Sequence, residues 1–439
     1  MVTTAYVNIW GKRAGAVAWN RETGWGSFEF DPRFDLDRFP LSPLKMPHKS
    51  RIYSFPNLSQ NETFRGLPGL LADSLPDRYG KELINVWLAQ QGRPENSLNP
   101  VELLCFIGQR GMGALEFEPV LKSKESSSYT FELSSLIDAT KAILAKKEEL
   151  YLQTSDEIRD VMLDVLKMGT SAGGARPKAI IAWNEQTGEI KSGQSNAEPG
   201  YEHYLIKFDG VSDVQFGASE GYGRIEMAYY KMATDFGIHM MESRLVEESG
   251  RAHFMTKRFD RQSGENIGAS HADRSLKMHS QTFCAMQHYD FANITSYSYE
   301  QLFQTMRMLK LSYAEAEQMY RRMVFNVIAR NCDDHTKNFS FLMSPETGQW
   351  TLAPAYDICF AYRPDSVWVS QHNLSINGKR KGFSRQDLLA LAEQNSIRRP
   401  DQVIEECLEV VNRWNGYAEE YAVDDLKRQA IDQTLIKKI

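Results

Sequence analysis

The polar run at residues 331–338 contains the residue types that phosphoryl transfer requires. It reads Asn-Cys-Asp-Asp-His-Thr-Lys-Asn between an apolar helical stretch and the strand-like run 339–343, which predicts a tight loop between two buried elements. Phosphoryl transfer needs a carboxylate that orients and deprotonates the attacking hydroxyl, and an oxygen ligand for magnesium beside it. Asp333 and Asn338 have four residues between them, which is the spacing of a kinase catalytic loop.

Two other side chains of this run could assist the same reaction. Lys337 could neutralise charge that develops on the γ-phosphate, and His335 is expected to hold the loop through hydrogen bonds. Taken alone, the run also fits an Asp- and Asn-rich turn that caps backbone groups.

A further acidic residue, Asp357, follows the short strand-like run 350–353, 19 residues after Asn338. Kinases use an aspartate at this place to bridge magnesium to the β- and γ-phosphates. The usual Asp-Phe-Gly is absent, because Ile358 and Cys359 follow Asp357. By itself Asp357 is equally compatible with a turn.

Residues 169–178 form a loop of small residues that ends at a strand-like run. The sequence is Gly-Thr-Ser-Ala-Gly-Gly-Ala-Arg-Pro-Lys, and small residues let backbone N–H groups close around phosphate oxygens. No Lys-Ser or Lys-Thr pair follows Gly174, which argues against a P-loop NTPase. A plain flexible turn is the alternative interpretation.

Lys207 lies in the apolar strand-like run 204–208, where a charge is costly unless it is paired. A kinase uses such a lysine to hold the α- and β-phosphates, paired with a helix glutamate. Glu226, near the start of the next helical stretch, is the expected partner. An edge-strand lysine with its ammonium in water is the alternative.

The order of these elements carries more weight than any one of them. A small-residue loop, a strand lysine, a helix glutamate, an Asp-to-Asn loop and a further aspartate follow one another as in a kinase.

The elements that would position these residues are predicted from hydrophobic periodicity. Residues 4–30 predict a small antiparallel sheet, and residues 64–88 predict a helix that Pro76 kinks or restarts. Strand-like runs at 179–183, 204–208 and 253–256 accompany a helix near 223–236. Later helices are expected at 299–309, 313–330, 385–395 and 401–415.

The polar, serine-rich segment 122–135 is the best linker candidate. We expect an N-terminal α/β subdomain over residues 1–122, an ATP-binding region over 136–259 and a helical region with the catalytic loop over 260–439. The fold class is predicted as α+β, with a bilobal kinase-like arrangement of a small β-rich lobe and a larger helical lobe.

Composition argues against several other classes of protein. A net charge of -6 does not indicate a nucleic-acid binder, and five scattered cysteines without a Cys-x-x-Cys pair argue against a zinc site or a disulfide framework. The N-terminus does not read as a signal peptide and no run of about 18 apolar residues occurs. We expect a cytoplasmic protein.

Several longer motifs resemble the HipA family of toxin kinases, and the likeness covers almost the whole chain. Residues 64–69 (Phe-Arg-Gly-Leu-Pro-Gly), 71–77 (Leu-Ala-Asp-Ser-Leu-Pro-Asp) and 107–115 resemble the N-terminal domain of that family. Residues 171–178 resemble its phosphate loop, and residues 333–340 resemble its catalytic loop.

The resemblance implies a serine/threonine kinase that uses ATP and Mg²⁺. Asp333 would be the general base, assisted by Lys337, with Asn338 and Asp357 as magnesium ligands. The adenine-contacting strand would fall at 255–259, although Lys257 stands where an acidic residue can occur. The implied nucleotide contacts are Ser171, Ala172, Gly173, Gly174, Lys178, Lys207, Glu226, Lys257, Phe259, His335 and Asp357.

The resemblance also implies regulation and partners. Family members autophosphorylate a serine that corresponds to Ser171, and phosphate there would repel the ATP phosphates. They pair with a small HipB-like DNA-binding antitoxin, through which they sit on operator DNA, and their known protein targets include aminoacyl-tRNA synthetases. The basic run Lys379, Arg380 and Lys381 fits either a DNA-backbone contact or a solvated turn.

Two other functions fit the same residues. A catalytically silent kinase fold could bind an antitoxin as a corepressor, although no catalytic position is visibly lost. A kinase for a small hydroxylated metabolite is the second alternative.

Overall fold

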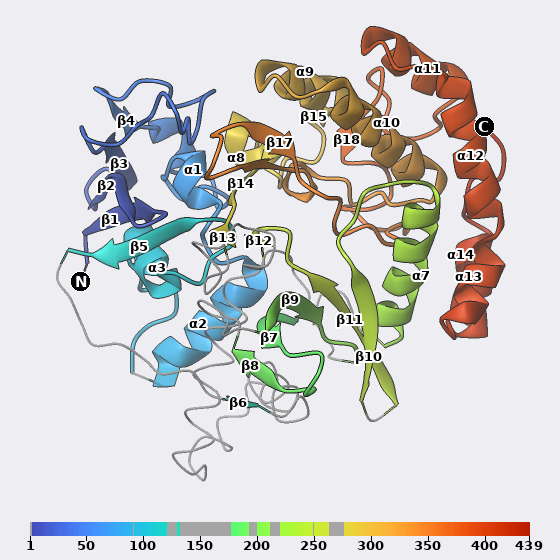
Figure 1. Cartoon of the computed structure of the whole chain (residues 1–439), viewed down its shortest axis with the longest axis horizontal. Coiled ribbons are helices and arrows are strands. Elements are labelled where there is room, and N and C mark those ends of the chain that lie inside the picture. Colours follow the sequence, from blue (N-terminus) through green and yellow to red (C-terminus); the bar gives the residue numbers. More distant parts are fainter. Residues whose placement is uncertain are drawn as a thin grey trace.

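The structure is a computed structural model, and it describes residues 2–90, 92–120, 130–131, 177–192, 200–210, 220–248, 250–262 and 276–439. Figure 1 shows an N-terminal unit of sheet and helices beside a second sheet, with most of the helices in the C-terminal part of the chain. All five cysteines are free thiols. A helix that spans a bilayer needs about 20 mostly apolar residues, and none within the described ranges meets that requirement.

The N-terminal unit is built on the antiparallel sheet that the sequence predicts. In strand β1 (Thr4–Ile9) Ala5, Val7 and Ile9 are buried while the residues between them are partly exposed, the period-two pattern of a sheet with one covered face. In spatial order its strands are β4 (Ile52–Ser54), β3 (Trp25–Phe30), β2 (Lys12–Asn20), β1 (Thr4–Ile9) and β5 (Leu115–Pro119).

Three helices belong to this N-terminal unit, which also contains the 3-10 turn η1 (Pro56–Leu58). They are α1 (Gly69–Ala72), α2 (Arg78–Gln90) and α3 (Pro100–Ile107). Pro76 lies between α1 and α2, so the predicted restart of the helix at this proline is confirmed.

The second sheet has six strands and is antiparallel throughout. Its order is β10 (Ser243–Glu248), β11 (Arg251–Lys257), β9 (Glu202–Lys207), β7 (Lys178–Trp183), β8 (Ile190–Ser192) and β6 (Thr130–Phe131). Helix α7 (Tyr222–Asp235) packs against β10 and β11. The segment predicted as a linker therefore contributes strand β6 to this sheet.

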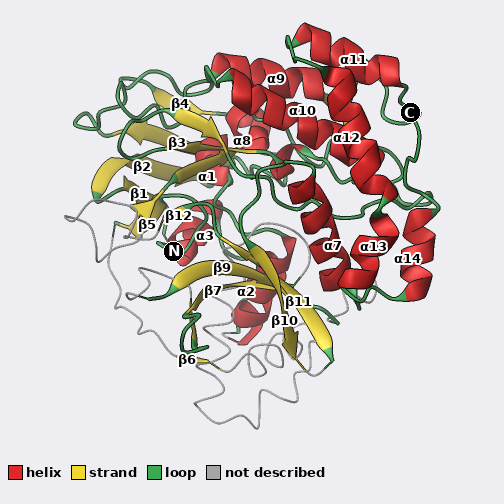
Figure 2. Cartoon of the chain, turned by 45° about the vertical axis from the view of Figure 1, so that its right-hand side comes forward, coloured by secondary structure: helices red, strands yellow, loops and turns green. Residues whose placement is uncertain are grey.

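The last part of the chain is mainly helical, and Figure 2 shows α9, α10, α11 and α12 gathered on one side of the molecule. Its helices are α8 (Phe283–Gln287), α9 (Tyr299–Met308), α10 (Tyr313–Ile328), α11 (Arg385–Gln394), α12 (Pro400–Asn412), α13 (Trp414–Glu420) and α14 (Asp425–Asp432). The short strands are β12 (Arg261–Gln262), β13 (Leu276–Lys277), β14 (His279–Thr282), β15 (Tyr297–Ser298), β16 (Ser340–Met343), β17 (Trp350–Leu352) and β18 (Leu374–Ser375).

The helix predicted over 401–415 is two helices in the structure. Helix α12 ends before Arg413, whose backbone leaves the helical conformation, and α13 starts at Trp414. The break lets the Trp414 indole become fully buried, edge-on to Tyr229 of α7 at a ring separation of 5.5 Å. Apolar periodicity alone does not report such a break.

A buried charge cluster joins the N-terminal unit to the segment after β11. The Asp260 carboxylate accepts hydrogen bonds from Arg258 at 2.7 and 2.8 Å, from Arg261 at 2.5 Å and from the Gly113 N–H at 2.6 Å. Both arginines also donate to the Gly111 carbonyl, at 3.2 and 3.1 Å. Gly113 has φ +77°, and a Cβ there would lie 2.9 Å from a backbone nitrogen, so this contact requires glycine.

Candidate active site

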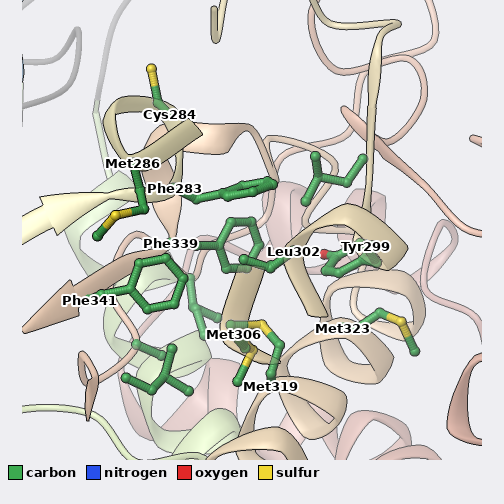
Figure 3. Packing of buried hydrophobic residues seen from close by; sticks show 14 of the residues in the cluster. Phe283, Cys284, Met286, Tyr299, Leu302, Met306, Met319, Met323, Phe339 and Phe341 are labelled. Carbon is green, nitrogen blue, oxygen red and sulfur yellow. The ribbon is translucent and has the colours of Figure 1, made fainter. Parts of the chain in front are cut away.

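The loop predicted to be catalytic lies between α10 and β16, and its second half is the 3-10 turn η3 (Thr336–Asn338). At its end Phe339 is buried, and Figure 3 shows its ring packed among apolar side chains of the helical part. The Asn338 side-chain N–H donates to the Asp333 carbonyl at 2.6 Å. That bond uses the nitrogen of the amide, so the amide oxygen is left for a cation.

The two adjacent aspartates of the loop have different environments. Half of the Asp333 side chain is exposed (47%), whereas Asp334 is buried. Asp334 accepts from the Tyr299 hydroxyl at 2.8 Å and from the Asn373 N–H at 2.7 Å, and it contacts His372 Nδ1 at 2.8 Å. Asp334 therefore anchors the loop, and Asp333 is the carboxylate that a substrate can reach.

The charge of Asp334 also acts on His372. Burial of the imidazole lowers its pKa, but the Asp334 carboxylate outweighs burial and raises the pKa of His372 to about 10. The loop is thus held by a buried imidazolium–carboxylate pair at neutral pH.

Lys207, at the end of β9, lies between two carboxylates. Its ammonium contacts Glu226 of α7 at 2.5 Å and also contacts Asp357. Burial disfavours the ammonium, yet the two carboxylates together raise the pKa of Lys207 above its ordinary value. Burial likewise disfavours the Asp357 carboxylate, and Lys207 outweighs it so that the pKa of Asp357 is lowered. The predicted lysine–glutamate pair is present in this structure.

Tyr356 joins Asp357 to the catalytic loop. Its hydroxyl lies 2.6 Å from the Lys337 carbonyl and 2.6 Å from the Ser340 hydroxyl. Asp357 itself has φ +52°, a left-handed conformation that aspartate tolerates better than most residues. This geometry keeps Asp357 close to the loop that carries Asp333 and Asn338.

Lys178, the first residue of β7, belongs to the same group of charges. It is the register partner of Lys207 across β7 and β9, so both side chains lie on one face of the sheet. The Lys178 side chain is 2% exposed, and its ammonium lies 3.0 Å from the Asp77 carboxylate of the N-terminal unit. Burial lowers the pKa of Lys178 although Asp77 and Asp357 oppose it.

Phe259, His335 and Lys337, which were also predicted at the site, contact aromatic side chains. The ring of Phe259 contacts that of Tyr356 in a tilted arrangement, with 5.5 Å between the ring centroids. His335 lies 5.4 Å from the ring of Phe291, and the Lys337 ammonium lies over that ring at 4.8 Å. Ser171, Ala172, Gly173 and Gly174 lie outside the described residues.

Lys257 is not brought to the lysine–carboxylate group. It pairs in register with Tyr204, three residues before Lys207, and forms an ion pair with Glu202. Because side chains alternate along a strand, Lys257 lies on the face of the sheet opposite to Lys207.

The basic run at 379–381 is partly engaged within the chain. Lys379 forms an ion pair with Asp387 at 2.8 Å, and Arg380 donates to the Tyr297 carbonyl at 2.9 Å and to the Asn373 carbonyl. Lys379 and Arg380 thus stabilise their own turn, which follows His372 and Asn373, the residues that contact Asp334.

Three residues of the site were not predicted: Asp77, Asp334 as an anchor, and Tyr356. Asp77 and Asp334 stand inside motifs that carried the family resemblance, and Tyr356 directly precedes the predicted Asp357. These positions in the sequence do not indicate which residue each side chain contacts.

The donor set fits magnesium bound together with a nucleotide. Among the described residues, no group of three or more His, Cys, Asp or Glu side chains could hold a metal by itself. Mg²⁺ usually takes only one or two protein oxygens and completes its shell with water and phosphate. Asp357 and the amide oxygen of Asn338 can supply that number, with Lys178 and Lys207 beside them for phosphate.

Two family models match the chain. The family model of the HipA-like C-terminal domain matches residues 170–414, and that of the HipA N-terminal domain matches residues 5–118. No curated protein sequence matches the chain.

Chains from several solved structures match this one. A chain of the Shewanella oneidensis MR-1 toxin–antitoxin complex of HipA, HipB and its operator DNA shares 17% identity with a TM-score of 0.65, covering 98% of this chain and 94% of that chain. The Helicobacter pylori proinflammatory kinase CtkA shares 12% identity over 60% of this chain and 90% of that chain, and its TM-score of 0.34 carries no argument. The predicted kinase-like α+β fold is confirmed.

Proposed function

The chain belongs to the HipA family, and from that premise we propose that it is an ATP- and magnesium-dependent serine/threonine protein kinase. In this proposal it is the toxin of a toxin–antitoxin pair, and its acceptor is a hydroxyl of a cellular protein such as an aminoacyl-tRNA synthetase.

The observation that carries the proposal is the position of Lys207 between Glu226 and Asp357. A kinase needs a lysine that a helix glutamate orients toward the phosphates, and an aspartate close by for the metal. A structural ion pair needs only one carboxylate for one lysine. The second carboxylate, Asp357, keeps an acidic oxygen beside Lys207, where it could bind the metal that accompanies the phosphates.

Each residue then has a defined task. Bound Mg-ATP supplies the γ-phosphoryl group and the positive charge that stabilises the leaving ADP. Asp357 and Asn338 would hold the cation, and Lys207 would hold the α- and β-phosphates. The acceptor oxygen forms a bond to the γ-phosphorus, the bond from that phosphorus to the β–γ bridging oxygen breaks, and the hydroxyl proton passes to Asp333.

The partner proposal rests on the complex of HipA, HipB and its operator DNA, because the fold of this chain is similar to that of one chain in it. We infer a small HipB-like antitoxin, with DNA contacted through that antitoxin. The intramolecular contacts of Lys379 and Arg380 support assigning these two side chains to the turn and not to a DNA contact.

Ser171 remains a proposed site of autophosphorylation, based on the sequence resemblance. Phosphate there would add about -1.5 to -2 charges in the segment that the sequence assigns to phosphate binding, and it should weaken nucleotide binding. Unchanged ATP affinity in the Ser171→Asp variant would refute this regulatory role.

Phosphate transfer from γ-labelled ATP to the proteins of a cell extract tests the main proposal. Wild type should label proteins, and Asp333→Ala should reduce the rate by about 10²- to 10⁴-fold, the usual contribution of a general base. The exposed Asp37 provides a matched control, because Asp37→Ala should leave the rate unchanged.

The outcomes separate the alternatives. Wild-type protein that binds Mg-ATP but transfers no phosphate would identify a silent corepressor. Transfer to small hydroxylated metabolites, with none to proteins, would identify a small-molecule kinase.

A further inference from the structure

One short segment of the N-terminal unit contacts both the helical part and the six-stranded sheet. It runs from Gly69 to Asp77 and includes α1 and the turn before α2. Figures 1 and 2 both show α2 beside strands β7 and β9, and Figure 1 shows α1 next to α8. The segment therefore lies where the two halves of the proposed kinase meet.

On the helical side this segment packs closely. The Gly69 N–H donates to His288 Nε2 at 2.9 Å, and a Cβ on Gly69 would lie 2.2 Å from the Ala285 carbonyl. Asp73 accepts from the Thr282 N–H at 2.6 Å and from its hydroxyl at 2.8 Å. These contacts fix the segment against α8 and the end of β14.

On the sheet side the contact is the ion pair between Asp77 and Lys178. Asp77 Oδ2 lies 3.0 Å from the Lys178 ammonium. Its other oxygen, Oδ1, accepts from the Gly80 N–H at 2.7 Å, which makes Asp77 the N-terminal cap of α2. The carboxylate is thus held by a helix on one side and by a lysine on the other.

Lys178 is next to the loop that the sequence assigns to phosphate binding. It follows Pro177 directly and is the register partner of Lys207. Two neighbouring ammonium groups repel each other, and each has its own carboxylate: Glu226 for Lys207 and Asp77 for Lys178. Asp357 acts electrostatically on both lysines.

We propose that Asp77 is a positioning residue that holds Lys178 toward the nucleotide phosphates, so that the N-terminal unit completes the ATP site. This inference rests on the proposed function. The Lys207–Glu226 pair is the lysine–glutamate pair of a kinase. The Lys178–Asp77 pair would be a second such pair, and its carboxylate comes from the N-terminal unit. An N-terminal unit displaced from the sheet would then lower ATP affinity without touching the catalytic loop.

The test is the affinity of the full-length protein for a fluorescent ATP analogue with Mg²⁺. Asp77→Asn removes the charge and keeps an oxygen that can cap α2, and it should weaken binding about tenfold. Asp424, which caps α14 through the Lys427 N–H at 3.1 Å, provides the matched control. Asp424→Asn should leave affinity unchanged.

A double-mutant cycle separates positioning from general stability. Lys178→Gln should itself weaken binding, and Asp77→Asn on that background should add nothing, because Asp77 acts through Lys178. A KM for ATP that rises while kcat changes little would agree. Independent, additive losses would overturn the inference.

The variant that combines Asp77→Asn with Lys178→Gln keeps the inference testable if Asp77→Asn alone does not fold. Asp77→Asn alone leaves a buried ammonium with less compensation, whereas the double variant leaves neither charge buried alone. If Asp77→Asn does not fold, the double variant should bind ATP as weakly as folded Lys178→Gln. Wild-type affinity in a folded Asp77→Asn or double variant refutes the inference. Wild-type protein that binds no nucleotide would instead overturn the proposed function, and this inference with it.

Discussion

The buried pair between His372 and Asp334 predicts a specific dependence of stability on pH. The folded-state pKa of His372 is about 10 against an ordinary value of 6.5. Because the folded-state value is the higher one, the pair contributes fully below about pH 6.5 and its contribution is lost as the pH rises to about 10. At about 1.36 kcal/mol per pKa unit, the contribution is about 4 to 5 kcal/mol.

The perturbation is His372→Asn, and the assay is urea unfolding at several pH values from 6.5 to 9. Fluorescence and circular dichroism should give coincident transitions if unfolding is two-state. In wild type the free energy of unfolding should fall by about 1.4 kcal/mol per pH unit relative to the variant. Subtracting the variant's free energy of unfolding from that of wild type cancels the contributions of tyrosines, lysines and cysteines that titrate in the same pH range.

Asp334→Asn provides the complementary variant. It removes the carboxylate that raises the pKa of His372, so the same slope should disappear, and the buried imidazole should become neutral. Equal slopes in wild type and both variants would refute the assignment of an imidazolium–carboxylate pair. Because Asp334 also anchors the loop that carries Asp333, phosphate transfer should fall in this variant even at a pH where it remains folded.

Two further predictions follow from the other buried charges. Glu226→Gln should lower kcat/KM for ATP about tenfold or more, because Lys207 would then be held by Asp357 alone. Kinetics that match wild type would contradict the role of the Lys207–Glu226 pair. Asp260→Asn should destabilise the fold by about 3 to 5 kcal/mol, because Arg258 and Arg261 lose their shared carboxylate, and an unchanged unfolding transition would contradict that account.

Local pattern predicted much of this architecture. The alternation at residues 4–30 gives three strands, and the apolar spacing at 313–330 gives α10, because strand and helix periodicity are properties of neighbouring residues. The same locality explains the accurate placement of the loop at 331–338 and the pairing of Lys207 with Glu226, which lie on successive elements.

Relations between distant residues could not be obtained in this way. Lys257 was expected at the nucleotide, yet its register against Tyr204 places it on the other face of the sheet. One residue of register decides the face of every side chain in a strand, and the sequence does not show which residues are opposite each other.

The sequence by itself determined which chemistry this chain can contain: a carboxylate and an amide at kinase spacing, a further aspartate, and lysines in apolar strands. Only the tertiary structure decided which of two adjacent aspartates is reachable and which is an anchor, and that Asp77 meets Lys178 about 100 residues further along the chain. The physical reason is that burial and charge pairing depend on how separate elements pack, whereas residue type and spacing are fixed before they do.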